Sequence, residues 1–149
     1  MLPAARTKAM EILLVEDGLT DAKVTIHSLR ATQIHHRLTL VRSLDEAKVF
    51  LSQTGIFARA PKPDLILLDM LLPDGSGMEL LRFLSESKDE EPTVVVLTAN
   101  EDRGTREQCV QLGVADYISK PVRQEEFLRV VREHKKVMIH RTPVLESSK

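Results

Sequence analysis

Short apolar runs alternate with segments of helical periodicity along this 149-residue chain, and the alternation limits the fold more than any other feature. The run EILLV is apolar at four of its five positions, as expected of a strand that is covered on both faces. Strands that alternate with helices favour right-handed crossovers and a parallel sheet between two helical layers. We therefore predict an α/β fold, a doubly wound parallel sheet whose five strands lie at residues 11–15, 37–41, 64–69, 93–99 and 115–119.

Helix signals lie between these runs. Ser43 and Glu46 have the spacing of a capping box, which predicts a helix start. Gly113 is expected to end the polar helix that follows the fourth strand. A last helix is predicted at residues 123–140, and the apolar residues that it should turn inward are Phe127, Val130, Val131 and Val137.

The composition fits one soluble globular domain, with 42% hydrophobic and 29% charged residues. The net charge of -1 provides no positive field for nucleic acid. No apolar run approaches the roughly 20 residues of a membrane helix, and the N-terminus lacks the apolar core of a signal peptide. We expect a cytoplasmic protein with no nucleic-acid or membrane partner, with an N-terminal arm at residues 1–9, a domain at 10–140 and a C-terminal tail at 141–149.

Cysteine and histidine residues offer no metal or redox motif. The single cysteine, Cys109, excludes an internal disulfide, and its neighbours predict a buried, inert thiol. The five histidines show no HExxH pattern or other metal-ligand spacing.

Polar side chains follow four of the predicted strands, at the ends that a parallel sheet brings to one edge. They comprise three carboxylates, one hydroxyl and one ammonium group: Glu16, Asp17, Asp69, Thr98 and Lys120. The set contains no histidine, cysteine or serine that would complete a hydrolase triad. Crowded carboxylates repel one another, and a hard divalent cation such as Mg²⁺ relieves that repulsion.

This set of groups suits phosphoryl transfer. A divalent cation with Lys120 opposite would neutralise the oxygens of an incoming phosphoryl group, and Thr98 could donate its hydroxyl to one of them. A carboxylate can be the nucleophile and form an acyl phosphate, and Asp69, isolated on its own strand, is the candidate. Asp74 lies nearby in the sequence PDGSG and is assigned to turn chemistry.

Four segments in this order, LLVED, LILLDMLLPDGSG, VVVLTA and ADYISKP, resemble the receiver domain of two-component response regulators from about Met10 to Met138. The resemblance implies the flavodoxin-like (βα)5 fold, with Mg²⁺ as cofactor and Mn²⁺ as an alternative. Asp69 then matches the phosphoacceptor and a metal ligand. Asp17 matches a direct metal ligand, Glu16 one that acts mostly through water, and Leu71 one that offers its backbone carbonyl.

The resemblance also assigns the remaining site residues. Thr98 and Lys120 match the hydroxyl and the lysine that contact the phosphoryl group, and Tyr117 matches the aromatic residue whose rotamer follows Thr98. The Lys120–Pro121 bond is expected to be cis. Leu71 and Asn100 lie at the two variable positions that border the site. Because a leucine cannot orient an attacking water, we hypothesise that Leu71 affects the lifetime of the phosphoryl group by steric cover.

The implied function is a single-domain response regulator, a phosphorylation-gated switch that is not a metabolic enzyme and that catalyses its own Mg²⁺-dependent phosphorylation and dephosphorylation. A sensor histidine kinase or phosphotransfer protein is expected as donor. Output is expected through binding of an unidentified protein near the fourth helix, fifth strand and fifth helix, a face that also suits a homodimer. The segments IHHRLTLV and GIFARAPKPDLILLD resemble stand-alone receivers that pair with bacterial phytochrome-type kinases.

Three rival functions are weaker. A phosphatase or mutase with an aspartyl nucleophile would carry an acid two residues after it, where this chain has Leu71. A nucleotide hydrolase would need the loop GxxxxGK[ST], and the chain contains no Gly-Lys pair. A receiver-shaped module that never takes phosphate would be expected to lack Asp69, one acid of the pair or Lys120, and the chain has them all.

Overall fold

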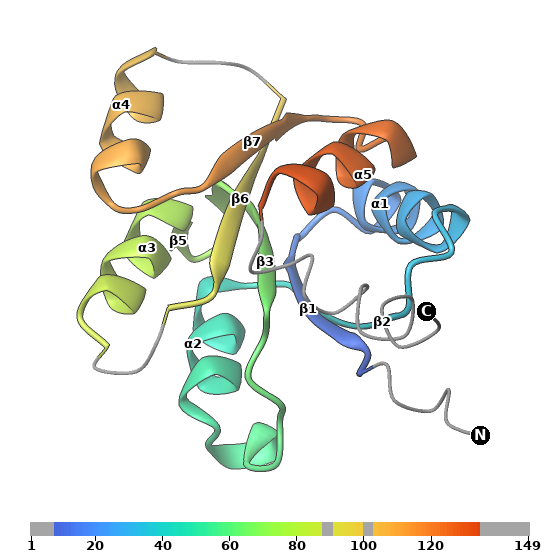
Figure 1. Ribbon diagram of the computed structural model, residues 1–149. Helices are drawn as coiled ribbons and strands as arrows, with labels where there is room; N and C mark the ends of the chain where they lie inside the picture. Colours follow the sequence, from blue (N-terminus) through green and yellow to red (C-terminus); the bar gives the residue numbers. More distant parts are fainter. Residues whose placement is uncertain (1–7, 88–90, 100–102, 135–149) are drawn as a thin grey trace.

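The computed structural model describes residues 8–87, 91–99 and 103–134, and its central feature is a parallel sheet with helices on both faces (Figure 1). The strand order is β2-β1-β3-β6-β7, and every neighbouring pair is parallel. The five strands are β1 (Met10–Val15), β2 (His36–Val41), β3 (Leu65–Asp69), β6 (Thr93–Thr98) and β7 (Asp116–Ser119). The doubly wound α/β fold predicted from the sequence is confirmed.

The described helices lie in two layers, with α1 and α5 on one face of the sheet and α2, α3 and α4 on the other (Figure 1). Their bounds are α1 (Leu19–Ala31), α2 (Leu44–Ser52), α3 (Gly77–Ser85), α4 (Arg103–Gln111) and α5 (Gln124–Glu133). The long connection between α2 and β3 contains a short 3₁₀ helix, η2 (Gly55–Phe57). Within the described residues, no helix is both long and apolar enough to cross a membrane.

Each face of the sheet carries its own hydrophobic core. Leu13 and Val15 of β1 pack in the cluster beneath α2 and α3, whereas Ile12 and Leu14 pack in the cluster beneath α1 and α5. Successive side chains of a strand point to opposite faces, so a strand that is covered on both sides must be apolar almost throughout. All six residues of β1 are buried, which explains the continuous apolar run in the sequence.

The helix starts only partly follow the predicted capping pattern. Ser43 caps α2 by accepting a hydrogen bond from Glu46 N at 3.1 Å, but the Glu46 carboxylate accepts from Arg42 N and does not return to Ser43. The complete capping box is at α3, where Ser76 Oγ accepts from Met78 N and Ser76 N donates to Glu79 Oε2. A serine cap of this kind stabilises a helix by about 1 kcal/mol.

The segment after β3, which contains the predicted turn PDGSG, forms a short hairpin. Leu71–Leu72 (β4) pairs antiparallel with Gly75–Ser76 (β5), and α3 begins directly afterwards. A Cβ atom on Gly77 would lie 2.8 Å from Met70 Sδ and 3.1 Å from the Asp69 carbonyl oxygen. The glycine therefore lets the start of α3 approach the end of β3, where the predicted nucleophile lies.

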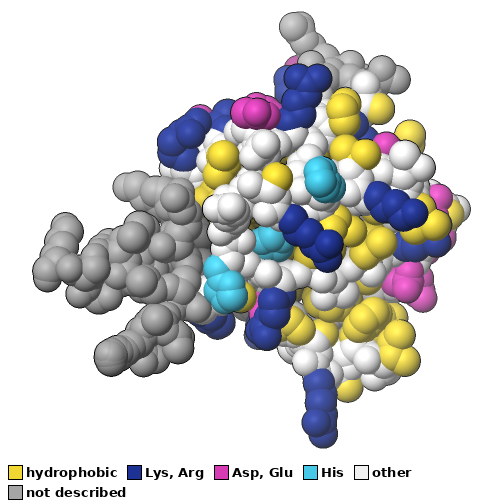
Figure 2. Space-filling model, turned by 90° about the vertical axis from the view of Figure 1, so that its right-hand side faces the viewer, with side chains coloured by type: hydrophobic (Ala, Val, Ile, Leu, Met, Phe, Trp, Pro, Cys, Tyr) yellow, Lys and Arg dark blue, Asp and Glu magenta, His cyan; other side chains and the backbone are white. Residues whose placement is uncertain are grey.

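The surface and the end of the last helix complete the fold. Figure 2 shows Lys and Arg side chains dispersed over one face among hydrophobic and polar groups, with no continuous basic stripe on the described part of that face. Helix α5 turns Phe127, Val130 and Val131 inward as predicted. The predicted extension to residue 140, including Val137, lies outside the described residues.

Candidate functional site

The ends of β1, β3, β6 and β7 bring the predicted site residues to one edge of the sheet. There they line a cavity of about 500 Å³, whose walls include Glu16, Asp17, Asp69, Thr98 and Lys120. Leu71 and Tyr117 also line it, whereas Asn100 lies outside the described residues. The parallel register thus unites side chains that are distant in sequence.

Lys120 follows β7 and reaches the acids at the ends of β1 and β3, and its side chain is only 12% exposed. Its Nζ atom lies 2.7 Å from Glu16 Oε1. It donates hydrogen bonds of 3.2 Å to Oδ2 of Asp69 and to Oδ2 of Asp21. Sequence reasoning missed Asp21, although its place in the first turn of the helix after β1 was a signal that it faces the same edge.

Burial and charge have opposing effects on these groups. Burial raises the pKa of Glu16, while the Lys120 ammonium and the backbone N–H of Gly18 act to lower it. Burial alone would lower the pKa of Lys120, but the carboxylates of Glu16 and Asp69 outweigh it and raise that pKa above the ordinary lysine value. The lysine is therefore held in its charged form.

The acids of this edge offer the donor type that a divalent cation binds, although among the described residues Glu16, Asp17 and Asp69 do not form a group with ligand atoms all within 4.8 Å of one another. Glu16 Oε1 is fully buried and accepts no well-directed hydrogen bond from the described residues, although the Lys120 ammonium lies close to it. The side chain of Asp17 is half exposed on the outer side of the cavity. Carboxylate oxygens are the donor type that hard cations such as Mg²⁺ prefer, and the Glu16 and Asp17 side chains supply them at this edge.

Two backbone contacts fix the position of Lys120. Lys120 N donates to the carbonyl oxygen of Thr98 at 2.8 Å, which joins the end of β7 to the end of β6. The Lys120–Pro121 peptide bond is cis. Two residues further on, the carbonyl oxygen of Val122 accepts a 2.7 Å hydrogen bond from Ser28 Oγ of α1. The lysine therefore projects from a segment that is anchored on both sides.

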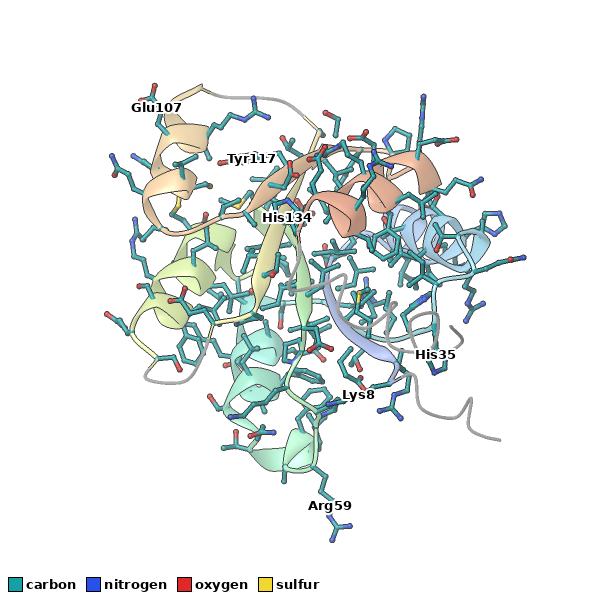
Figure 3. All side chains as sticks on the ribbon, in the orientation of Figure 1. Lys8, His35, Arg59, Glu107, Tyr117 and His134 are labelled. Carbon is teal, nitrogen blue, oxygen red and sulfur yellow. The ribbon has the colours of Figure 1, made fainter. Side chains whose placement is uncertain are left out.

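The side chain of Tyr117 projects from β7 toward α4 (Figure 3) and lines the cavity. Its hydroxyl donates to the carbonyl oxygen of Arg106 at 2.8 Å, and the Arg106 guanidinium lies 4.4 Å from the ring centroid. Burial is the main cause that raises the pKa of the phenol. The ring is thus held against α4 by a hydrogen bond and a cation–π contact.

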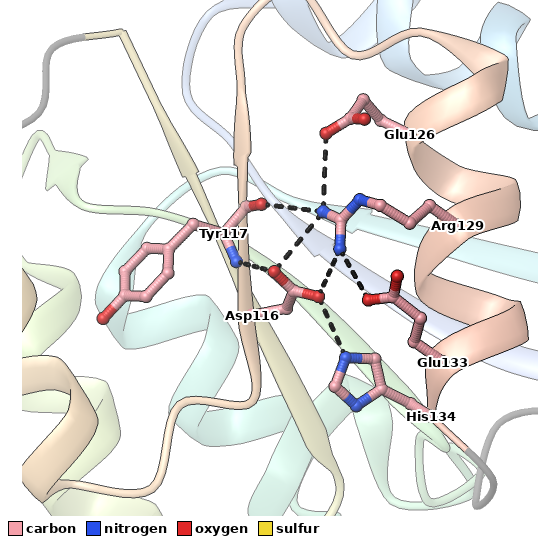
Figure 4. A network of polar contacts seen from close by, with 6 residues as sticks. All are labelled: Asp116, Tyr117, Glu126, Arg129, Glu133 and His134. Atoms are coloured by element: carbon pink, nitrogen blue, oxygen red, sulfur yellow. Dashed lines mark hydrogen bonds and ion pairs between the residues drawn. The ribbon is translucent and has the colours of Figure 1, made fainter.

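The backbone of Tyr117 is fixed by a salt-bridge cluster on β7 and α5 (Figure 4). Arg129 donates to the carbonyl oxygen of Tyr117 at 3.2 Å and to Asp116 Oδ2 at 2.7 Å. Burial would raise the pKa of Asp116, but hydrogen bonds from Arg129 and His134 lower it.

Among the residues described, Asp116, Glu133 and His134 are the group whose possible metal-ligand atoms lie within 4.8 Å of one another. The Arg129 guanidinium already contacts both acids of that group, so a salt-bridge cluster explains it.

A model of the response regulator receiver domain matches residues 12–132 of this sequence. The chain belongs to the response regulator receiver family. The fold and the set of strand-end residues agree with this membership, and the receiver extends over nearly all of the described residues.

Two response regulators are similar in sequence to this receiver. It is 33% identical over 122 residues to the response regulator Rcp1 of Synechocystis sp., covering 81% of this chain and 83% of Rcp1. It is 31% identical over 119 residues to the transcriptional regulatory protein CitT of Halalkalibacterium halodurans, covering 80% of this chain but only 49% of CitT. The receiver therefore spans about half the length of that regulator.

Solved structures are similar over most of the receiver. The phosphorylated cyanobacterial phytochrome response regulator RcpA has a TM-score of 0.73 at 31% identity, covering 85% of this chain and 91% of RcpA. The Mn²⁺-bound form of Rcp1 has a TM-score of 0.71 at 32% identity, covering 83% of this chain and 90% of Rcp1.

The hairpin after Asp69 is fixed to a neighbouring helix by a residue whose role the sequence did not reveal. The Asp74 carboxylate accepts hydrogen bonds from Leu44 N at 2.7 Å and from Asp45 N at 2.9 Å, at the start of α2. The assignment of Asp74 to turn chemistry was therefore incomplete, because its side chain caps a helix that begins 30 residues earlier.

We expect Asp74→Asn to weaken this attachment in a pH-dependent way. The pKa of Asp74 lies below its usual value because the carboxylate accepts the N–H groups of Asp45 and Leu44. A carboxylate with a lowered folded-state pKa stabilises the fold above its unfolded pKa of about 3.9, and the stabilisation is lost as pH falls through the folded value. Urea unfolding at several pH values should show a lower midpoint for Asp74→Asn at pH 7.

The acid side of the same profile provides the check. Below the folded-state pKa of Asp74 the wild type and Asp74→Asn should converge, since both then carry an uncharged side chain at this position. Glu107→Gln, on the exposed surface of α4, is the matched control and should follow the wild type throughout. A constant difference between Asp74→Asn and wild type at every pH would contradict the charged-cap explanation.

Proposed function

We propose that this receiver accepts a phosphoryl group on Asp69 from a histidine kinase or phosphotransfer protein and signals through a phosphorylation-dependent change in protein binding. The observation that supports this most is the position of Asp69 at the end of β3, in an open cavity, with the Lys120 ammonium 3.2 Å from its carboxylate. The nucleophile is thus accessible, and a cation stands beside it to balance the charge that arrives with the phosphoryl group.

In the proposed transfer, a carboxylate oxygen of Asp69 attacks the phosphorus of a phosphohistidine. The phosphorus–nitrogen bond breaks, an acyl phosphate forms, and the departing imidazole takes a proton. Lys120 and the Thr98 hydroxyl then contact the phosphoryl oxygens. We assign Glu16, Asp17, Asp69 and the carbonyl of Leu71 to a Mg²⁺ or Mn²⁺ site, and the Mn²⁺-bound form of Rcp1 supports the assignment. The bound ion would neutralise charge on the transferring group.

Phosphorylation would change the contacts of this edge. A phosphoryl group adds a charge of about -1.5 to -2, which Lys120 and Thr98 can engage. A shift of Thr98 would favour release of Tyr117 from its contacts with Arg106 and alter the face formed by α4, β7 and α5. We assign binding of a downstream protein, or of a second copy of the receiver, to this face. Asn100, which borders the same edge in sequence, is assigned a role in tuning the site.

We further propose that the donor is a phytochrome-type histidine kinase and that the receiver acts alone in the cytoplasm. The support comes from the response regulator Rcp1 and from the phytochrome response regulator RcpA, both of which align with most of this chain and with most of their own length. The domain would then extend over residues 10–140, between an arm at residues 1–9 and a tail at 141–149.

Labelling with acetyl phosphate tests the phosphoacceptor. The wild-type protein should gain one phosphoryl group in the presence of Mg²⁺, as measured by intact mass, and should gain almost none when EDTA removes the cation. Asp69→Asn should take no label, because the amide is a poor nucleophile. Asp74→Asn, which alters a carboxylate in the same hairpin, is the matched control and should still be labelled. Equal labelling of Asp69→Asn and wild type would contradict the proposal.

The identity of residue 71 is expected to set the lifetime of the acyl phosphate. Leu71 lies two residues after Asp69, is 83% exposed and lines the same cavity, so we assign it a place beside the path of an attacking water. An asparagine at this position could hydrogen-bond that water, which a leucine cannot do. We expect Leu71→Asn to hydrolyse its phosphoryl group about threefold to tenfold faster than wild type, a modest share of what positioned general catalysis contributes.

The rate is measured by following loss of the phosphorylated mass after the donor is removed. Leu71→Met is the control, because it keeps an apolar side chain of similar size and should retain the wild-type rate. An unchanged rate for Leu71→Asn would refute steric cover by Leu71.

A further inference from the structure

Arg42 lies between β2 and α2, yet its side chain contacts the loop that follows β1. Its Nη2 atom donates a 2.8 Å hydrogen bond to the carbonyl oxygen of Asp17, and its Nε atom donates to the same oxygen at 3.3 Å. Nη2 also lies 3.7 Å from Asp17 Oδ1. A positive charge is therefore placed beside a carboxylate that has, in the proposed function, the role of metal ligand.

The base of this arginine is fixed. Arg42 N donates to Glu46 Oε1 at 2.9 Å, and the helix start that follows is capped by Ser43. The Asp74 carboxylate holds the first N–H groups of the same helix. The guanidinium therefore reaches Asp17 from an anchored position, and its two hydrogen bonds to one carbonyl oxygen restrict it further.

Lys120 and Arg42 contact different acids of this edge and differ in exposure. Lys120 is only 12% exposed and is engaged by three carboxylates inside the cavity. The side chains of Arg42 and Asp17 are 47% and 51% exposed, so this ion pair is in contact with solvent. A cation that binds Asp17 therefore has the charge of Arg42 close by, in addition to that of Lys120 at the neighbouring acids.

We propose that Arg42 is a positioning residue that weakens divalent-cation binding at the acidic site by holding a fixed positive charge beside Asp17. The inference rests on the proposed function, in which Asp17 binds Mg²⁺. A divalent ion at Asp17 must compete with the Arg42 ion pair and is repelled by the guanidinium. Both effects act between partly exposed groups, so they are modest and are screened by salt.

Calorimetric titration with Mg²⁺ tests this inference without any phosphoryl transfer. At low ionic strength we expect Arg42→Gln to bind Mg²⁺ about threefold to tenfold more tightly than wild type, the size of effect that one nearby surface charge produces. At about 1 M NaCl the difference should largely disappear, because the Debye length falls to about 3 Å. Arg42→Lys keeps the charge and should stay within about twofold of wild type.

Arg30→Gln is the matched control for net charge, because Arg30 lies in the last turn of α1 and not among the residues that line the cavity. Its Mg²⁺ affinity should equal that of wild type. Arg42→Gln binding that is equal to or weaker than wild type at low salt would overturn the inference. Equal tightening by Arg42→Lys and Arg42→Gln would also overturn it, because charge would not be the cause. Failure of the wild type itself to bind Mg²⁺ would instead refute the proposed metal site.

Discussion

The contact of the Lys120 ammonium with the carboxylates at the strand ends is the interaction on which the functional edge depends. Glu16 and Asp69 project into a partly buried cavity, where uncompensated negative charges would repel each other and lose hydration. A lysine anchored through its own N–H and the following loop supplies the compensating charge. A buried ion cluster is weak evidence for stability, so its presence is better explained by chemistry that needs charge at this place.

The start of α2 links the two loops that carry the acids. Arg42, next to the start of α2, donates a hydrogen bond to the carbonyl oxygen of Asp17 in the loop after β1. Asp74, in the hairpin after β3, accepts a hydrogen bond from Leu44 N at the start of the same helix. Both loops are therefore attached to the start of α2. This helix start lies on the opposite side of the site from α4 and β7. Cation binding and phosphoryl transfer would act on groups whose positions this terminus sets.

The sequence predicted the features that depend on periodicity, and it missed those that depend on loop packing. The strands could be predicted from continuous apolar runs, because a strand that is buried on both faces is apolar almost throughout. A parallel sheet of these strands brings Glu16, Asp69 and Lys120 to one edge. Asp21 was missed because its contact with Lys120 joins residues 99 positions apart. The capping box was assigned to Ser43, whereas the complete one lies at Ser76, since the Glu46 side chain finds a different backbone N–H. The spacing of residues in the sequence shows which capping hydrogen bonds are possible, and the packing of the folded chain determines which of them form.

Chemical trapping of the phosphorylated residue tests the central claim most directly. Borohydride reduces an aspartyl phosphate to homoserine, and peptide mass spectrometry then identifies the position. After Mg²⁺-dependent phosphorylation by acetyl phosphate, we predict homoserine at position 69 and at no other carboxylate. Homoserine at position 17, 21 or 74, or its absence from a protein that carries the phosphoryl label, would contradict the assignment of Asp69 as the phosphoacceptor.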